Sequence, residues 1–308
     1  MADIDAHLVE ADPQSDSLRV FKDVFAGTCG GIAQVLSGQP FDTTKVRLQS
    51  APEGTYNGAL DVVKKLLKNE GFAGFYKGTL TPLVGVGACV SIQFGVNEFM
   101  KRTFIARNKA AGFEDPRLTH GQFYIAGAAA GIANGFLASP IEHIRIRLQT
   151  QTGEVKAFNG PIDAVRKMYN GSGVRGVFRG ITPTLIREGH GMGAYFLAFE
   201  ALVDREIKVK HVERKDIPGW KLCLFGASAG YAMWFTSYPI DIVKSKMQTD
   251  ALDPKGQQYK STLDCFRKIY VQNGIKGFFK GFLPTILRAA PVNACTFYTF
   301  ELVIRYLG

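Results

Sequence analysis

The strongest constraint on this chain is a charged motif that recurs three times at an almost constant interval. Each copy reads proline, any residue, an acid, two residues, a base, three residues and then glutamine. The copies occupy residues 40–49, 140–149 and 239–248. A pattern repeated at a fixed period indicates repeated architecture. We therefore expect three structural units of about 100 residues, rather than the two or so soluble domains that length alone suggests.

The three units share further features. A Gly-x-x-x-Gly pair opens thirteen residues before each proline, and small residues four apart let helices approach closely in a membrane. Short amphipathic stretches follow each motif at 58–69, 160–170 and 261–272. Each unit is predicted to contain a long helix, a short surface helix and a second long helix. The six long helices are expected at 19–49, 78–105, 118–150, 180–206, 217–249 and 281–306.

Composition favours a membrane protein of an unusual kind. The chain has 34 glycines and 23 phenylalanines, yet no uninterrupted run of the roughly 20 apolar residues that mark an isolated spanning helix. Weakly apolar helices fit a bundle around a water-filled interior, where one face never meets lipid. We predict an all-α membrane protein with six transmembrane helices in three pseudo-symmetric repeats. A soluble helical solenoid is the alternative, but its common repeats are shorter.

Charge and cysteine usage narrow the function. The net charge of +10 suggests anionic partners, and the absence of a Lys/Arg block favours a membrane or a small solute over nucleic acid. Five scattered cysteines form no Cys-x-x-Cys pair, so neither a disulfide framework nor a metal site is expected. We see no nucleophile triad or nucleotide loop, and predict a protein that is not an enzyme and needs no cofactor.

Residues 1–17 are acidic and are expected to form a disordered tail, unlike a cleavable presequence.

These motifs resemble those of the mitochondrial carrier family. The first copy matches the family signature through Glu70-Gly71 and Tyr76-Lys77-Gly78, whereas Ser172 and Asn273 stand where the later copies should carry an acid. The resemblance implies a multi-pass inner-membrane carrier, monomeric, with bound cardiolipin and short helices on the matrix side. Its repeats would span 18–110, 111–210 and 211–308. Such a carrier works by alternating access.

The proline motif is interpreted as a gate. Proline inside a helix bends its axis, and an acid and a base three residues apart share one helix face. The kinks are expected at Pro40, Pro140 and Pro239. Three separate intrahelical pairs, each worth about 0.3–0.5 kcal/mol, are the alternative. The resemblance instead implies a ring at the matrix end that pairs Asp42 with Arg145, Glu142 with Lys244 and Asp241 with Lys45, braced by Gln49, Gln149 and Gln248.

The resemblance also implies a cytosolic gate and lipid contacts. The cytosolic gate would use Glu98, Lys101, Glu200 and Glu301 on the even-numbered helices. Only one base is in place, because Val203 and Ile304 occupy the other two positions, so this gate is expected to be weak. Cardiolipin phosphates are assigned to helix starts at Gly58, Gly78, Gly160, Gly180 and Gly281, where free amides attract anions. Ordinary helix capping explains these glycines nearly as well.

Substrate choice is expected where the repeats differ. Seven residues beyond each Lys/Arg-Gly glycine stand Gly85, Arg187 and Arg288, and Glu188 follows Arg187. The resemblance assigns these positions to substrate. Arginine holds a carboxylate in bidentate geometry, and glutamate accepts from an ammonium. Structural pairing of Arg187 and Glu188 with other helices is the alternative. His190, one turn on, is either a proton-coupling residue or a plain polar lining residue.

The stretch 187–193 resembles the amino acid and carnitine/acylcarnitine branch of the family, and within it a fungal subgroup linked to glutamate or glycine. We therefore expect a small amino acid or related carboxylate as substrate, with glutamate or glycine favoured. Carnitine, acylcarnitine or a basic amino acid is the alternative. A non-transporting membrane assembly or receptor protein on the same scaffold is the rival of a different class. Trp234 is expected to pack or to act as a steric filter.

Overall fold

The computed structural model describes residues 16–52, 54–113, 117–151 and 157–307, and every regular element in these ranges is a helix. The long helices are α2 (Asp16–Ser50), α4 (Leu80–Ala110), α5 (His120–Thr150), α7 (Ile181–Lys210), α8 (Gly219–Thr249) and α10 (Phe282–Leu307). The shorter ones are α3 (Ala59–Glu70), η1 (Phe72–Tyr76), α6 (Pro161–Val177), η2 (Arg214–Asp216), η3 (Pro254–Gly256), α9 (Thr262–Asn273) and η4 (Ile275–Phe279). The predicted order of long, short and long helices is therefore present in each repeat. Within a repeat we call the first long helix odd (α2, α5, α8) and the second even (α4, α7, α10).

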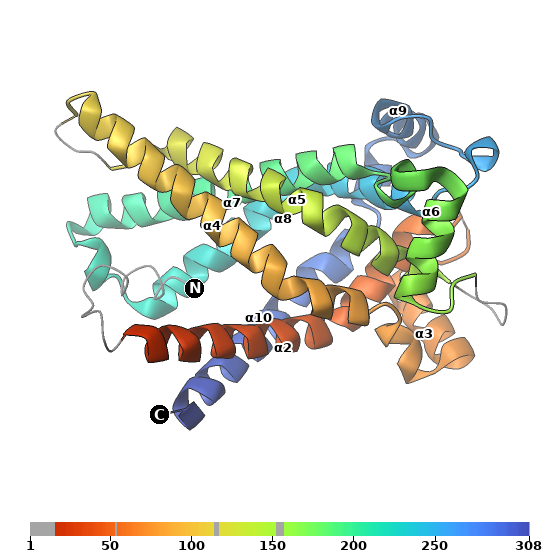
Figure 1. The fold of residues 1–308 in the computed structure, drawn as a ribbon, viewed down its shortest axis with the longest axis horizontal. Helices are drawn as coiled ribbons and strands as arrows, with labels where there is room; N and C mark the ends of the chain where they lie inside the picture. Colours follow the sequence, from red (N-terminus) through yellow and green to blue (C-terminus); the bar gives the residue numbers. More distant parts are fainter. Residues whose placement is uncertain (1–15, 53, 114–116, 152–156, 308) are drawn as a thin grey trace.

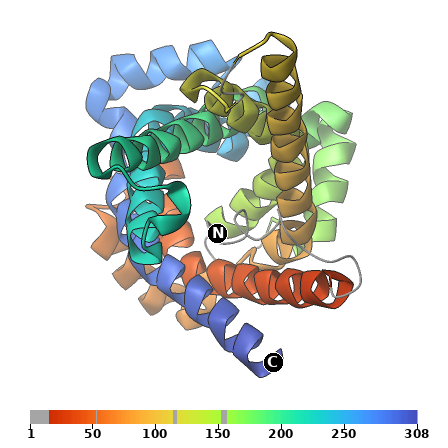
Figure 2. The ribbon, with the colours of Figure 1, turned by 90° about the vertical axis from the view of Figure 1, so that its left-hand side faces the viewer.

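The six long helices form a ring, as Figure 2 shows in the view from one end. Neighbours in the ring follow the chain, from α2 through α4, α5, α7 and α8 to α10, and α10 packs back against α2. The helices α3, α6 and α9 gather at one end, on the right of Figure 1. We call this the short-helix end and the other the far end. The odd helices finish at the short-helix end, so the proline motifs lie there.

Local sequence explains where the elements begin and end. Thr119 and Gln122 form a capping box at the start of α5, with hydrogen bonds of 3.3 and 3.0 Å to each other's backbone amides. Gly71, Gly173 and Gly274 close the three short amphipathic helices with positive φ angles of 68°, 61° and 59°, a conformation that glycine adopts without strain. In α6 the helix continues beyond this kink, because residues 174–177 turn again in helical form.

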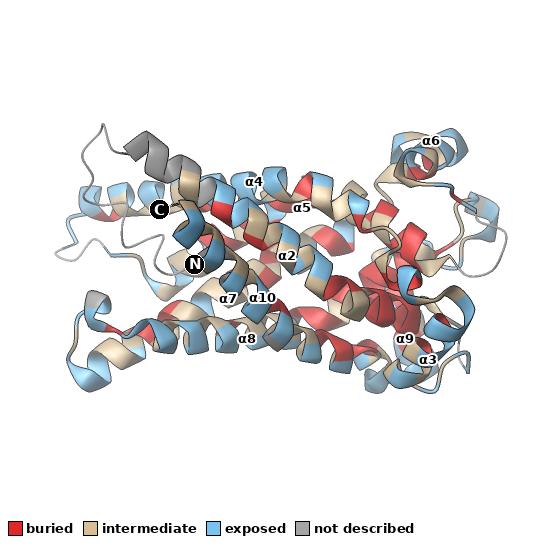
Figure 3. Ribbon diagram, turned by 90° about the horizontal axis from the view of Figure 1, so that it is seen from below, coloured by how far each residue is buried: buried red, intermediate tan, exposed pale blue. Residues whose placement is uncertain are grey.

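Burial is concentrated at the short-helix end, where Figure 3 shows most of the buried residues. One apolar cluster there joins α8 to α9 and η4, with Tyr238, Ile242, Ile269 and Phe278 among its members. A smaller cluster packs Met168 of α6 against α5. Many other buried side chains at this end are polar. The short-helix end is therefore a closed layer with a polar centre and apolar cores beneath the short helices.

The long helices also leave large apolar side chains exposed. Val84, Phe136, Phe235 and Leu283 are all more than half exposed. The shortest long helix has 26 residues and is about 39 Å long at 1.5 Å per residue, which exceeds the roughly 30 Å hydrocarbon core of a bilayer. By length and composition together, Phe72–Ala110 and His120–Thr150 contain segments able to span a membrane.

The Gly-x-x-x-Gly pairs are not equivalent, which corrects the expectation that each brings two helices together. A Cβ added at Gly127 would lie 2.7 Å from the carbonyl oxygen of Met192, and one at Gly131 would collide with the carbonyl of Glu188. At Gly27 and Gly230, by contrast, a Cβ would meet nothing within 4 Å. Among the described residues, the Gly127–Gly131 pair of the second repeat presses an odd helix, α5, tightly against its own even helix, α7, whereas Gly31 and Gly226 meet their neighbours only at the ordinary contact distance of 3.5 Å. The sequence pattern is symmetric, but the packing is not.

Candidate functional site

Three ion pairs join the odd helices at the short-helix end. Asp42 Oδ2 lies 2.7 Å from Arg145 Nη2, and Lys45 Nζ lies 2.7 Å from Asp241 Oδ2. Lys244 Nζ is in contact with Glu142 Oε2. These are the three interhelical pairs that the family resemblance implies, so the alternative of three separate intrahelical pairs is wrong. Each acid is joined to the next repeat or, for Asp241, to the first. A buried pair of this kind balances desolvation against attraction, and its net contribution is small.

The glutamines one turn further contact the ring unequally. Gln49 Nε2 donates to Asp241 Oδ2 at 3.3 Å and contacts the Tyr238 hydroxyl at 3.0 Å. Gln149 and Gln248 instead reach the hydroxyls of Thr43 and Thr184, at 3.3 and 3.4 Å. Of these three glutamines, only Gln49 has a side-chain hydrogen bond to a member of the ring's ion pairs among the described residues.

A brace that the sequence analysis missed is Gln39. Its Oε1 accepts from Arg145 Nη2 at 2.6 Å, while its Nε2 donates to the carbonyl of Lys77 at 3.1 Å. Gln39 comes directly before Pro40, but its counterparts in the other repeats are Ser139 and Tyr238. A search for repeated residues could not find it, because its role is specific to one repeat.

Aromatic rings surround the third pair. Lys45 Nζ lies 4.6 Å from the centre of the Trp234 ring and 5.3 Å from that of Tyr238. Cations are attracted to aromatic faces at such distances, most strongly when they are desolvated. Trp234 thus packs as expected, and it does so against a residue of the ion-pair ring.

The two predicted substrate arginines touch the acids of the ring. Arg187 Nη2 donates to Glu142 Oε1 at 3.1 Å, and its Nε lies 3.7 Å from Asp241 Oδ1. The same guanidinium contacts Glu188. Arg288 Nε lies 3.1 Å from Asp42 Oδ1. The alternative, in which Arg187 pairs with other helices, is therefore present in this structure, and both guanidiniums are engaged by carboxylates of the protein itself. The substrate role of these arginines remains a prediction.

Gly85 and His190 complete the predicted substrate set. A Cβ at Gly85 would lie 2.5 Å from Cδ1 of Ile141, so this buried glycine lets α4 pack closely against α5. His190 Nδ1 is 2.9 Å from the Tyr124 hydroxyl, a hydrogen bond between α7 and α5. Neither residue contacts the ion-pair ring, and their roles toward a solute remain predictions.

The residues of the predicted cytosolic gate lie at the far end. Glu98 pairs with Lys101 of its own helix at 3.3 Å. Glu200 is buried and held by both terminal nitrogens of Arg214, at 2.9 and 3.1 Å. Arg214 lies in η2, outside any repeated motif, which is why the sequence did not reveal it. The side chain of Glu301 lies outside the described residues.

The glycines assigned to cardiolipin fall into two groups. Gly78, Gly180 and Gly281 have φ angles near +80°, and at Gly180 a Cβ would lie 2.9 Å from Cγ of Gln248. Backbone conformation and close packing therefore account for these three. Gly58 and Gly160 precede α3 and α6, and a Cβ at either would meet nothing within 4 Å. Only the second group leaves open space beside a helix start, and lipid binding remains a prediction at all five.

Glu70, the acid of the family signature in the first repeat, has a structural role. Glu70 is held by Arg47 at 2.5 and 2.8 Å and by Lys77 at 2.5 Å. Burial alone would raise the pKa of Glu70, but the hydrogen bonds from Arg47 and Lys77 hold that pKa below its ordinary value. The carboxylate therefore stays ionised and ties α3 to the end of α2.

In the second repeat, an acid of the third repeat takes the place of the missing signature acid. Ser172 stands where the acid is expected, and Arg179, the counterpart of Lys77, pairs instead with Asp250 of the third repeat at 2.5 Å. Burial acts to raise the pKa of Asp250, but hydrogen bonds from the backbone amides of Gln258, Tyr259 and Ala251 and the charge of Arg179 keep it below its ordinary value. The departure from the signature is thus compensated across an interface between repeats. Asp250 was missed because it lies just beyond the proline motif.

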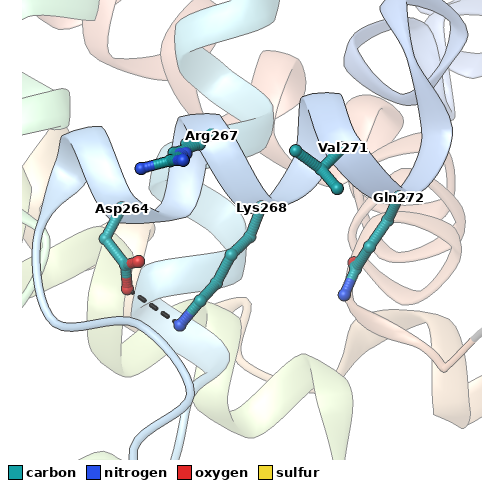
Figure 4. A pocket seen from close by; sticks show the side chains of 5 residues that line it. All are labelled: Asp264, Arg267, Lys268, Val271 and Gln272. Atoms are coloured by element: carbon teal, nitrogen blue, oxygen red, sulfur yellow. Dashed lines mark hydrogen bonds and ion pairs between the residues drawn. The ribbon is translucent and has the colours of Figure 1, made fainter.

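A hollow on the surface of α9 is a separate feature. It encloses about 370 Å³ and is lined by Asp264, Arg267, Lys268, Val271 and Gln272, as Figure 4 shows. All five belong to one short helix, and the Asp264–Lys268 pair at 3.0 Å is an ordinary surface pair. This hollow has no part in the ion-pair ring.

Comparison with known proteins identifies the family. The profile of the mitochondrial carrier protein family matches residues 16–108, 117–208 and 215–308. The chain belongs to the mitochondrial carrier family. It is 55% identical over 303 residues to the mitochondrial glycine transporter YMC1 of Saccharomyces cerevisiae, covering 97% of this chain and 96% of that protein.

Two further relatives show the breadth of the similarity. The carrier is 51% identical to the glutamate/glycine mitochondrial carrier ymc1 of Schizosaccharomyces pombe, over 93% of this chain and 94% of that one. It is 39% identical to the human mitochondrial basic amino acids transporter, over 92% and 90% of the two chains. The three-repeat, all-α membrane fold predicted from the sequence is therefore confirmed.

Proposed function

We propose that this carrier moves a small amino acid, glycine or glutamate, across the inner mitochondrial membrane by alternating access. The proposal is supported by the names of its two fungal relatives, a glycine transporter and a glutamate/glycine carrier. The short-helix end would face the matrix and the far end the intermembrane space. The protein would act as a monomer with bound cardiolipin, and would not be an enzyme.

The observation that carries the proposal is the engagement of Arg187 and Arg288 by acids of the ring. A solute carboxylate that binds Arg187 competes with Glu142, and one that binds Arg288 competes with Asp42. Glu188 is then free to accept a hydrogen bond from the solute's ammonium. Binding of an amino acid thereby removes a partner from the ion pairs that close the short-helix end.

This competition links recognition to opening. A ring of ion pairs has little net stability, so a contribution of a few kcal/mol from bound solute suffices to change which end is open. Glutamate offers two carboxylates for the two guanidiniums, and glycine offers one. The short-helix end is closed by three ion pairs in this structure, which supports a state that admits solute from the opposite side, the intermembrane space.

Uptake by the purified carrier in liposomes tests the proposal. Labelled glycine and glutamate should accumulate, whereas carnitine, arginine and dicarboxylic acids that lack an ammonium group should be weaker competitors. Arg288→Ala should abolish uptake because one guanidinium is lost, while Arg267→Ala on the surface of α9 should leave it unchanged. Uptake of carnitine or arginine in place of glycine would support the alternative substrates. A folded protein that takes up none of these solutes would support the rival receptor or assembly function.

A further inference from the structure

The three interfaces between repeats are closed unequally at the short-helix end. Each interface carries one ion pair of the ring. A further basic residue stands seven residues after each motif proline. At two of the three interfaces this residue makes a second set of contacts beyond the ring. This position holds Arg47 and Arg147 in the first two repeats, and Lys246 in the third.

The two arginines each bind the end of the next odd helix. Arg47 Nε donates to the carbonyl of Gln149 at 2.9 Å, and its Nη2 to that of Gln151 at 3.4 Å. Arg147 donates to the carbonyls of Thr249, at 3.4 Å, and Asp250. The last carbonyls of a helix have no partner within the helix, so a guanidinium placed there satisfies them and interacts with the negative end of the helix dipole.

The third interface, between repeats three and one, lacks this contact. Among the described residues no hydrogen bond or ion pair is formed by the Lys246 ammonium. A cavity of about 280 Å³ lies between Lys246 and the end of α2 at Ser50 and Ala51. The place that a guanidinium fills at the other two interfaces is open space here.

The contacts that hold the third interface all lie at the level of the ion-pair ring. Gln49 and the aromatic rings all act on the Lys45–Asp241 pair. Arg187 also lies near Asp241, at 3.7 Å. Gln49 also contacts the Tyr238 hydroxyl at 3.0 Å, and Arg288 of the third repeat pairs with Asp42 of the first at 3.1 Å. Beyond this layer, where the other two interfaces have their arginines, no hydrogen bond or ion pair among the described residues joins the ends of α8 and α2.

We propose that the short-helix end opens first at the interface between repeats three and one, with Arg47 and Arg147 as positioning residues that keep the other two interfaces closed. This order of opening rests on the proposed alternating access, but not on which solute is carried. Substitution of Lys246 by arginine should supply the missing contact and remove the asymmetry.

Matched cysteines test the order of opening. Ser50, Thr150 and Thr249 occupy the same position in the three repeats, and each hydroxyl bonds the carbonyl four residues earlier, at 2.7, 3.0 and 2.8 Å. Each is replaced by cysteine in a carrier whose five native cysteines are serine, and labelling by a hydrophilic maleimide is timed without solute. We expect Ser50→Cys to react at least threefold faster than the other two. Thr249 lines the same cavity, so its labelling rate is the control for the access that the closed cavity already gives.

Two variants complete the test. Lys246→Arg should lower the labelling rate of Ser50→Cys to that of the others and slow exchange in liposomes. Arg147→Lys should accelerate labelling of Thr249→Cys, and it keeps the experiment decisive if Lys246→Arg does not fold. Equal rates at the three positions, or a rate at Ser50→Cys that Lys246→Arg leaves unchanged, would overturn the proposal. Failure of uptake with asymmetric labelling would overturn the transported solute alone.

Discussion

Replacing Asp241 by asparagine should destabilise the carrier more than any surface charge change. The side chains of Lys45 and Asp241 are only 10% and 5% exposed, and they meet at 2.7 Å. Asparagine keeps the shape and can still accept from Gln49, but it leaves the Lys45 ammonium buried without its counter-charge. Breaking a buried pair by removing one partner costs about 3–5 kcal/mol. Because the Trp234 and Tyr238 rings still face the ammonium, we expect the lower end, about 3 kcal/mol, or about 150-fold in the equilibrium constant.

Thermal unfolding of the detergent-purified protein measures this loss. The midpoint should fall by about 6–12 °C if each kcal/mol is worth about 2–4 °C. Asp61→Asn is the matched control, because Asp61 pairs with Lys65 on the surface of α3, where the side chains are 26% and 47% exposed. An exposed pair contributes at most about 1 kcal/mol.

A double variant separates the lost pair from other effects. Lys45→Met together with Asp241→Asn removes both charges, so it should be more stable than Asp241→Asn alone. If Asp241→Asn unfolds at the same temperature as Asp61→Asn, or if the double variant is the less stable one, then the pair is not the buried contact described above.

Two further predictions follow from the packing and the second-repeat acid. Gly131→Ala should cost about 1–3 kcal/mol in thermal unfolding, because its Cβ meets the backbone of Glu188, whereas Gly230→Ala should be neutral or stabilising. Asp250→Asn should cost about 1–3 kcal/mol, since it leaves Arg179 without its carboxylate. The pKa of Asp250 is lowered in the folded state, so its contribution is fully present above about pH 4 and is lost only as pH falls further. A difference from the unmodified carrier that changes between pH 5 and pH 8 would contradict this assignment.

The repeated residues were predictable, and those specific to one repeat were not. Asp42, Glu142 and Asp241 could be assigned partners because the threefold motif resembles that of the mitochondrial carrier family, and the resemblance implies how the acids and bases pair. The same symmetry was misleading for the glycine pairs, since close approach depends on the facing helix and only α7 offers Glu188 and Gly189 opposite Gly131.

Contacts made by residues at unrepeated positions could not be predicted from the sequence. Gln39, Arg214 and Asp250 lie outside the signature. Each contacts a charged residue of another element, namely Arg145, Glu200 and Arg179 respectively. Arg187 was expected either to face a solute or to pair with other helices, and its guanidinium contacts Glu142 and Glu188. A buried cation pairs with a nearby anion of the protein, and the sequence pattern does not show which acidic residue will be close enough.

The contact of Gly131 with Glu188 also limits how selectivity can change if Arg187 and Glu188 bind the solute as proposed. The backbone that holds these two residues is pressed against α5 and has no room to move toward it. Divergence at the proposed site would then proceed by exchanging side chains rather than by moving this backbone toward α5. Redesign of selectivity should therefore succeed by substitutions at 187 and 188 alone, and grafting of the whole helix from a relative should fail unless the glycines of α5 are transferred with it.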